Sequence, residues 1–129
     1  MLRRIADYQI ISQVEHWPDL GGRRKKQHSE NDDVNGLWRN RSFHNYADYA
    51  LTLQFQDSLA ALISDAMSCR MALMCSEAVW WRCHRRIISD YLLSRDLQVL
   101  HIMGVGKAVP AMMTPGSRVL ADGSIHYPS

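Results

Sequence analysis

The sequence predicts a small α/β protein, built on a mostly parallel sheet with flanking helices. Three observations predict this class. Residues 70–75 form a short apolar run that suits a strand buried on both faces, and residues 97–102 form a second one. Residues 80–95, between them, have helical periodicity. A strand, a helix and a strand in this order are typical of a right-handed crossover between parallel strands.

The length and composition indicate one soluble domain over residues 1–129. The chain has 129 residues, of which 47% are hydrophobic, and its net charge of +2 requires no acidic partner. No apolar run approaches the roughly 18 residues that a membrane span needs, and the N-terminus lacks the apolar core of a signal peptide. Three cysteines, an odd number, are expected to be free thiols in a reducing compartment. We therefore expect a cytoplasmic protein without a membrane partner.

The first half of the chain is expected to contain a loop and then helices. Residues 21–36 are polar and rich in turn-forming residues, which predicts a mobile surface loop. Residues 45–67 have helical periodicity, with a short break at Leu51 and with Thr52 as the cap of a second segment. The apolar stripe of this region consists of Phe55, Leu59, Leu62, Ile63 and Ala66.

The last part of the chain, residues 104–129, is expected to be a tail. It contains the pair Asp122-Gly123 between apolar residues, which is a signal for a β-hairpin turn.

The stretch MCSEAVWWRCHRR, residues 74–86, holds the chemically most interesting side chains. In a parallel sheet, ligands bind at the carboxyl ends of the strands, where Cys75 and Glu77 are expected. A helical rotation of about 100° per residue places His84 on the inner, apolar face of the next helix, with Cys83 on its flank. The same rotation places Arg82 and Arg86 on the opposite face. We therefore expect Cys75, Glu77, Cys83 and His84 to converge at the carboxyl edge of the sheet.

Thiol chemistry is the leading interpretation of this cluster. Cys75 would be the nucleophile or redox thiol, because a nearby helix N-terminus favours the thiolate. His84 would act as the base and Glu77 would orient it. Arg82 or Arg85 would hold an anionic substrate.

Three other interpretations stay open. Two thiolates, an imidazole and a carboxylate could bind a metal ion, although the Cys-x7-Cys-His spacing is not that of a structural zinc site. The basic and aromatic residues could instead belong to a non-catalytic module that contacts nucleic acid or another anion, through phosphate binding and base stacking, or that binds a protein partner. The same cysteines and tryptophans could simply pack in the core. The residues assigned to the nucleic-acid or anion contact are Arg23, Arg24, Trp81, Arg82 and Arg86.

The same stretch resembles the family known as domain of unknown function 488. Members carry Cys-x-Glu followed by Trp-x-Cys-His-Arg, and the matching residues are Cys75, Glu77, Trp81, Cys83, His84 and Arg85. The segments HWPDLGGRR (16–24), YADYALTLQFQDSL (46–59), VLHI (99–102) and TPGSRVLADGSIHYP (114–128) are similar to further parts of the family. The resemblance implies an α/β fold and a functional Cys75–Glu77–Cys83–His84–Arg85 cluster, without choosing a reaction or a cofactor.

The resemblance also implies a difference at the N-terminus. Family members usually begin with a strand, a helix and a strand that this sequence lacks. A sheet without those strands would expose an unpaired edge, so we expect a homo-oligomer that covers it.

Overall fold

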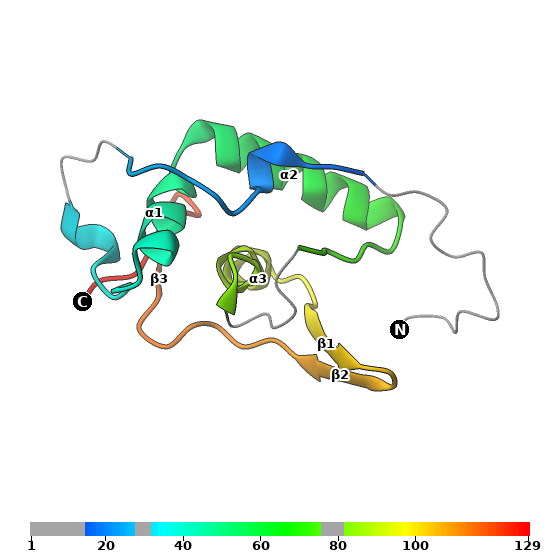
Figure 1. The fold of residues 1–129 in the computed structure, drawn as a ribbon. Helices are drawn as coiled ribbons and strands as arrows, with labels where there is room; N and C mark the ends of the chain where they lie inside the picture. Colours follow the sequence, from blue (N-terminus) through cyan, green and yellow to red (C-terminus); the bar gives the residue numbers. More distant parts are fainter. Residues whose placement is uncertain (1–14, 28–31, 76–81) are drawn as a thin grey trace.

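The computed structural model describes residues 15–27, 32–75 and 82–129. Within these ranges the helical elements are α1 (Arg41–Tyr49), α2 (Leu53–Ser68) and α3 (Arg85–Ser94), with two short 3-10 helices, Pro18–Leu20 and Asp32–Asn35. Figure 1 shows α3 beneath α2, with α1 to one side of both. The segment around Pro18–Leu20 runs alongside α2.

The two helices α1 and α2 have side-chain caps at their first turns. The Asn40 side chain accepts hydrogen bonds from the backbone N–H groups of Ser42 and Phe43, and Thr52 accepts one from Phe55. Such caps satisfy N–H groups that have no partner inside the helix. The predicted break at Leu51 and the predicted cap at Thr52 are both confirmed.

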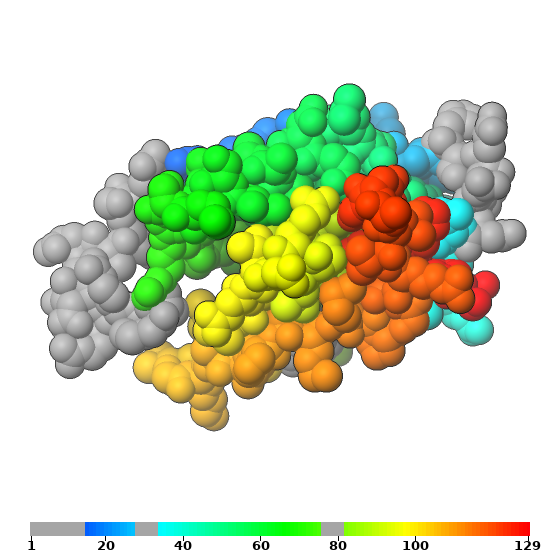
Figure 2. Space-filling model, turned by 180° about the vertical axis from the view of Figure 1, so that it is seen from behind, coloured from blue at the N-terminus to red at the C-terminus, as the bar shows by residue number. Residues whose placement is uncertain are grey.

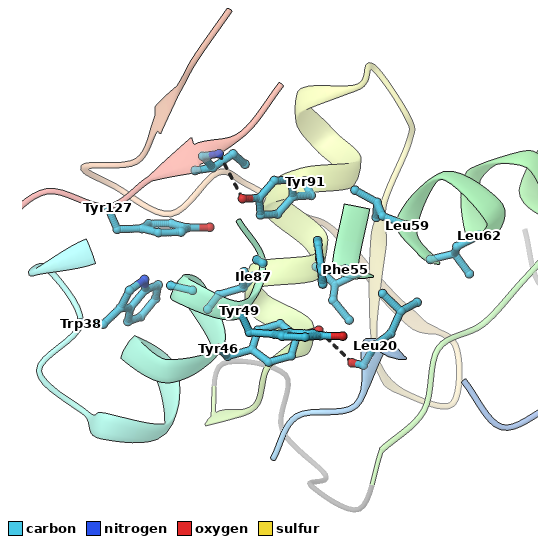
Figure 3. Packing of buried hydrophobic residues seen from close by; sticks show 14 residues of the cluster. Leu20, Trp38, Tyr46, Tyr49, Phe55, Leu59, Leu62, Ile87, Tyr91 and Tyr127 are labelled. Atoms are coloured by element: carbon cyan, nitrogen blue, oxygen red, sulfur yellow. Dashed lines mark hydrogen bonds between the residues drawn. The ribbon is translucent and has the colours of Figure 1, made fainter. Parts of the chain in front are cut away.

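The core lies between the three helices and is rich in aromatic side chains (Figure 3). Tyr46 and Tyr49 of α1 contact Phe55 of α2 edge to face, and Phe55 contacts Tyr91 of α3. Edge-to-face contacts of this kind add to the free energy gained from burying the rings. Of the predicted stripe on α2, three side chains are buried and Ile63 packs against the core, whereas Ala66 is exposed. The buried three are Phe55, Leu59 and Leu62.

The prediction of a parallel sheet is wrong. The described strands form two antiparallel pairs, β1 (Leu100–Gly104) with β2 (Lys107–Pro110) and β3 (Arg118–Val119) with β4 (Ile125–His126). The second apolar run, 97–102, enters β1, whose partner follows directly along the chain through a tight turn at Gly106, where φ is 71°. Consecutive strands joined by so short a turn must be antiparallel.

The other predicted strand, 70–75, has no regular secondary structure and no strand partner among the described residues. Ala72, Leu73 and Met74 are exposed rather than buried on both faces. A short apolar run does not by itself identify a buried strand, since only hydrogen bonding to a neighbouring strand makes it one. The helix predicted over 80–95 begins at Arg85, and the first two residues of that prediction lie outside the described ranges.

The predicted hairpin at Asp122-Gly123 is confirmed. It joins β3 to β4, and Gly123 has a φ of 88°, a conformation that glycine adopts without strain. The side chain of Asp122 accepts hydrogen bonds from the backbone N–H and the hydroxyl of Ser124.

The residues after this hairpin belong to the core. Tyr127 is fully buried, and its backbone N–H lies 2.8 Å from the carbonyl oxygen of Val34. Its hydroxyl donates to the carboxylate of Asp90 on α3 at 2.8 Å, while the other carboxylate oxygen accepts from the backbone N–H of Thr114 at 2.9 Å. The segment after residue 110 is thereby fixed to α3 and to the segment before α1, as the course of the chain in Figure 1 shows.

The β1–β2 hairpin has a different environment. Figure 1 shows it extending away from the helices, and in Figure 2 it lies at one corner of the molecule. Several of its apolar side chains are exposed, including Leu100, Ile102, Met103, Val105 and Val109. No described helix is both long enough and apolar enough to cross a bilayer.

Candidate functional site

Two thiols and an imidazole come together where the end of segment 70–75 lies near the start of α3. One ligand atom from each of Cys75, Cys83 and His84 lies within 4.8 Å of the other two. We call these three residues the Cys–His cluster. Of the four residues expected to converge, these three do so, and the fourth, Glu77, lies outside the described residues. The expected place is wrong, because the described strands form no parallel sheet with a carboxyl edge. Instead, the N-terminal turn of a helix positions two members of the cluster.

That turn explains the position of the Cys83 sulfur. Residues 82–84 form a turn that leads into α3, and Cys83 is 7% exposed. Its Sγ accepts hydrogen bonds from the Nε–H of Arg85 at 2.9 Å and from the Arg85 backbone N–H at 3.3 Å. Burial raises the pKa of the Cys83 thiol, and the Arg85 contacts oppose that rise. Arg85 thus anchors the buried sulfur and stabilises its thiolate form.

Cys75 is the more accessible of the two cluster thiols. It is half-buried, whereas Cys69, the third cysteine, is exposed at the C-terminal end of α2 and donates to the carbonyl oxygen of Asp65. Burial would lower the pKa of Arg85, but Cys83 and Cys75 together raise it. Both cluster sulfurs therefore interact with the same guanidinium group.

His84 is held by residues from a distant part of the chain. A Cβ atom added to Gly22 would lie 2.3 Å from the Nδ1 of His84, so only a glycine allows this approach. On another side, the ring of Tyr46 lies 5.1 Å from the His84 ring, centroid to centroid. The hydroxyl of Tyr46 donates to the carbonyl oxygen of Leu20 at 2.8 Å, which joins α1 to the segment that contains Gly22 (Figure 3).

The same segment brings a second cation toward the cluster. Arg24 lies over the ring of Tyr49 at 3.8 Å and donates to the carbonyl oxygens of Gly21 and Pro18. The pKa of His84 is lowered by burial first, and then by the positive charges of Arg85 and Arg24. The imidazole is therefore neutral near pH 7, with a lone pair available for a proton or a metal ion.

One residue near the site was not selected from the sequence. His101 on β1 is buried, and its pKa is lowered by burial and by the charge of Arg85. The charge of Arg85 therefore acts on the β1–β2 hairpin as well as on the cluster. In the sequence, nothing about this lone histidine in an apolar run indicates that it lies near the cluster. The Gly21-Gly22 pair, by contrast, does indicate a close approach of the backbone to another group.

The remaining predicted site residues have different environments. Arg23 and Arg82 are exposed, while Arg24 is half-buried beside the cluster. Arg86, expected on the outer face, is half-buried: its guanidinium lies 5.1 Å from the Trp38 ring and its Nε donates to the Thr114 hydroxyl. A guanidinium can pack on an aromatic ring and still satisfy its N–H groups, so an arginine in a helical pattern need not face solvent. Glu77 and Trp81 lie outside the described residues.

Taken together, these residues place two sulfurs and a neutral imidazole beside two guanidinium groups. Sulfur and imidazole can act as nucleophile and base, or as ligands for a soft metal ion. The guanidinium groups supply a positive potential that attracts anions. The described residues thus provide the components of both thiol chemistry and metal binding.

The chain was compared with known proteins. No curated protein and no solved structure matches it. A family model described as "Domain of unknown function DUF488" matches residues 4–92. The matched range contains the whole Cys–His cluster, together with Gly22, Arg24 and Arg85, whereas both hairpins follow it. The chain therefore belongs to the DUF488 family.

Proposed function

We propose that the protein performs thiol–disulfide exchange with a small anionic disulfide through Cys75 and Cys83. The observation that supports this function is the presence of two sulfurs within 4.8 Å of each other that differ in accessibility. A dithiol reaction needs one thiol that the substrate can reach and a second one close enough to resolve the intermediate. Half-buried Cys75 meets the first requirement and buried Cys83 meets the second.

The reaction proceeds in two displacements. The Cys75 thiolate attacks one sulfur of the substrate disulfide, forms a mixed disulfide and releases the first substrate thiolate, which takes up a proton. The Cys83 thiolate then attacks the Cys75 sulfur and releases the second substrate thiolate. The two protein thiols lose two electrons, and the substrate disulfide gains them. His84, within 4.8 Å of both sulfurs, accepts a thiol proton directly or through one water molecule.

The test follows the fate of each sulfur in a Cys69→Ser background, which removes the exposed third thiol. Reduced protein is treated with glutathione disulfide in the presence of a chelator, and the products are measured by intact-mass spectrometry and non-reducing peptide mapping. We expect an internal Cys75–Cys83 disulfide without an adduct. Adding Cys83→Ser should stop the reaction at one glutathione on Cys75. Faster modification of Cys83 than of Cys75, or the absence of the internal disulfide, would contradict the proposal.

The preference for an anionic substrate can be tested with neighbouring arginines. Arg24 lies near the cluster, whereas Arg23 is exposed, and either change to glutamine removes one positive charge. Arg24→Gln should slow the reaction with glutathione disulfide more than the reaction with uncharged hydroxyethyl disulfide. Arg23→Gln should slow neither. Equal effects of the two changes would remove the support for a specific anion contact.

Binding to nucleic acid is an alternative function, with less support. Of the five residues assigned to it, the two exposed arginines are Arg23 and Arg82, while Arg24 and Arg86 are half-buried and already contact aromatic rings. A nucleic-acid complex would weaken steeply with salt, and Arg82→Ala would weaken it further. Binding of single-stranded DNA that does not change with salt would contradict this alternative.

We also propose that the protein is a homo-oligomer in the cytoplasm. Free thiols suit a reducing compartment. The exposed apolar side chains of the β1–β2 hairpin, among them Ile102 and Val109, support an interface with a second copy. Sedimentation at micromolar concentration should show a dimer or larger species, which Ile102→Lys with Val109→Lys should dissociate. A wild-type monomer would contradict the proposal.

A further inference from the structure

The donor atoms of the Cys–His cluster also suit a thiophilic divalent cation. Two sulfurs and one imidazole nitrogen are a combination that Zn²⁺ prefers over oxygen-binding cations such as Mg²⁺ or Ca²⁺. Within the part of the chain that the structure describes, no other group of three such side chains is placed for a metal ion. The exposed Cys69 stands apart from this group.

The spacing of these atoms is close to that of a tetrahedral site. Zinc–sulfur bonds of about 2.3 Å and zinc–nitrogen bonds of about 2.0 Å place neighbouring ligand atoms of a tetrahedron roughly 3.5–3.8 Å apart. The three cluster atoms lie within 4.8 Å of one another, so each distance needs to shorten by at most about 1.0–1.3 Å to reach this spacing. Rotations of the side chains about their own bonds can supply such a shift.

The surroundings would orient the ligands. Arg85 donates two hydrogen bonds to the Cys83 sulfur, an interaction that metal-bound thiolates commonly accept. Gly22 and Tyr46 fix the ring of His84 from two sides. Two thiolates would also neutralise the charge of the cation, so that the nearby arginines do not prevent its binding.

We propose that Cys75, Cys83 and His84 of the reduced protein bind Zn²⁺. The described residues supply three ligands, which is the number that the protein provides in zinc sites where water or a substrate completes the tetrahedron. Zinc binding does not require the exchange reaction, but the two use the same pair of sulfurs. A cation on both sulfurs blocks their attack on a disulfide, and the internal disulfide removes both sulfur ligands. Zinc and oxidant would then compete for the same pair of thiols.

The test is a titration of the reduced full-length protein with Co²⁺, which has absorption bands that report its ligands. We expect one Co²⁺ per chain, with a sulfur-to-cobalt charge-transfer band in the near ultraviolet and the strong visible bands of tetrahedral cobalt. Added Zn²⁺ should displace the cobalt and abolish both. Octahedral cobalt spectra, or spectra without the sulfur band, would overturn the proposal.

Single substitutions assign the ligands. Cys75→Ser and Cys83→Ser should each lower the affinity by more than the roughly 10- to 100-fold that loss of an outer contact causes. The matched control is Cys69→Ser, which removes a cysteine outside the cluster and should leave both the affinity and the spectrum unchanged. Loss of the sulfur band in Cys69→Ser, or a sulfur band of undiminished intensity in cobalt-saturated Cys75→Ser, would overturn the assignment.

His84→Gln separates this proposal from thiol exchange. It removes the imidazole ligand but keeps both sulfurs, so cobalt affinity should fall. In the presence of a chelator, the internal disulfide should form more slowly, because the proton acceptor is gone, but to the same final extent. Circular dichroism verifies that the variant is folded. If wild-type protein forms the disulfide but binds no cobalt, zinc binding is refuted and the exchange function stands. If it binds cobalt through sulfur but forms no disulfide, the exchange function is refuted and zinc binding stands.

Discussion

Single residues from distant parts of the sequence determine the orientation of His84. Gly22 touches the imidazole from one side, and the Tyr46 ring packs on another. Both the proton-accepting role and the metal-binding role of His84 depend on this orientation. Gly22 is therefore a positioning residue for the Cys–His cluster.

The substitution Gly22→Ala tests this dependence. Its Cβ atom would overlap the His84 ring, so the ring or the backbone must move, and overpacking of this kind costs about 1–3 kcal/mol of unfolding free energy. Urea unfolding measures the loss, and cobalt titration should show weaker binding.

The matched control is Gly104→Ala, because an added Cβ at Gly104 meets no atom within 4 Å. It should change the unfolding free energy and the cobalt affinity little. Equal effects at both positions would mean that the close approach of Gly22 to His84 has no functional importance.

The helices and the sheets differ in how well the sequence predicts them. The α1–α2 region was predictable because its signals are local: Thr52 accepts a hydrogen bond from Phe55, and the apolar residues of α2 repeat with helical spacing. The parallel sheet was wrongly predicted because strand pairing depends on residues far apart in the sequence, and an apolar run such as 97–102 is compatible with either direction.

The cluster itself was predictable for a reason that did not require the sheet. Cys83 and His84 are adjacent in sequence, and Cys75 lies only a short distance upstream, so a turn into α3 brings them together. The sequence marks Gly22 as a place of close backbone approach and Arg24 as an anion contact, but it does not indicate that either residue, or His101, lies near the cluster. These residues come from other segments, which tertiary packing brings to the cluster.

The capping residue of α2 permits a test at the level of one element. Thr52→Ala removes the side-chain acceptor of the Phe55 N–H and should lower the unfolding free energy by about 1 kcal/mol. Thr52→Ser keeps a hydroxyl acceptor and should retain most of the stability. Chemical denaturation with circular dichroism measures both, and equal losses would contradict a capping role.

At the scale of the whole molecule, Asp90 joins segments that are distant in sequence. Its carboxylate accepts hydrogen bonds from Thr114 and Tyr127, and Arg86 lies near enough to influence it. Burial raises the pKa of Asp90, although these three neighbours act to lower it. The link between α3 and the C-terminal segment is therefore sensitive to pH.

The sign of this dependence follows from proton linkage. Because the folded-state pKa of Asp90 lies above the unfolded value of about 3.9, the folded protein holds this proton more tightly. The contribution of Asp90 to stability is then greatest below the unfolded value and is lost as the pH rises through the folded-state pKa. The difference in unfolding free energy between the wild type and Asp90→Asn should fall as the pH rises from the unfolded-state pKa through the folded-state pKa, and should then level off.

Urea unfolding at a series of pH values measures this difference. Asp57→Asn, which makes the same change to an exposed carboxylate on α2, is the matched control for the substitution itself. A difference that increases with pH would contradict the raised pKa of Asp90.

The burial of Ile125 and Tyr127 has a consequence for biosynthesis. Their sites in the core cannot be filled until the ribosome has made them, whereas Cys75 and Cys83 are made much earlier. At about 5–20 residues per second, roughly 2 to 9 s separate the synthesis of Cys83 from that of Tyr127. Once these cysteines leave the ribosome, they have no completed core around them until Ile125 and Tyr127 are in place. Oxidants and metal ions in the cell therefore have access to these cysteines before the protein has finished folding.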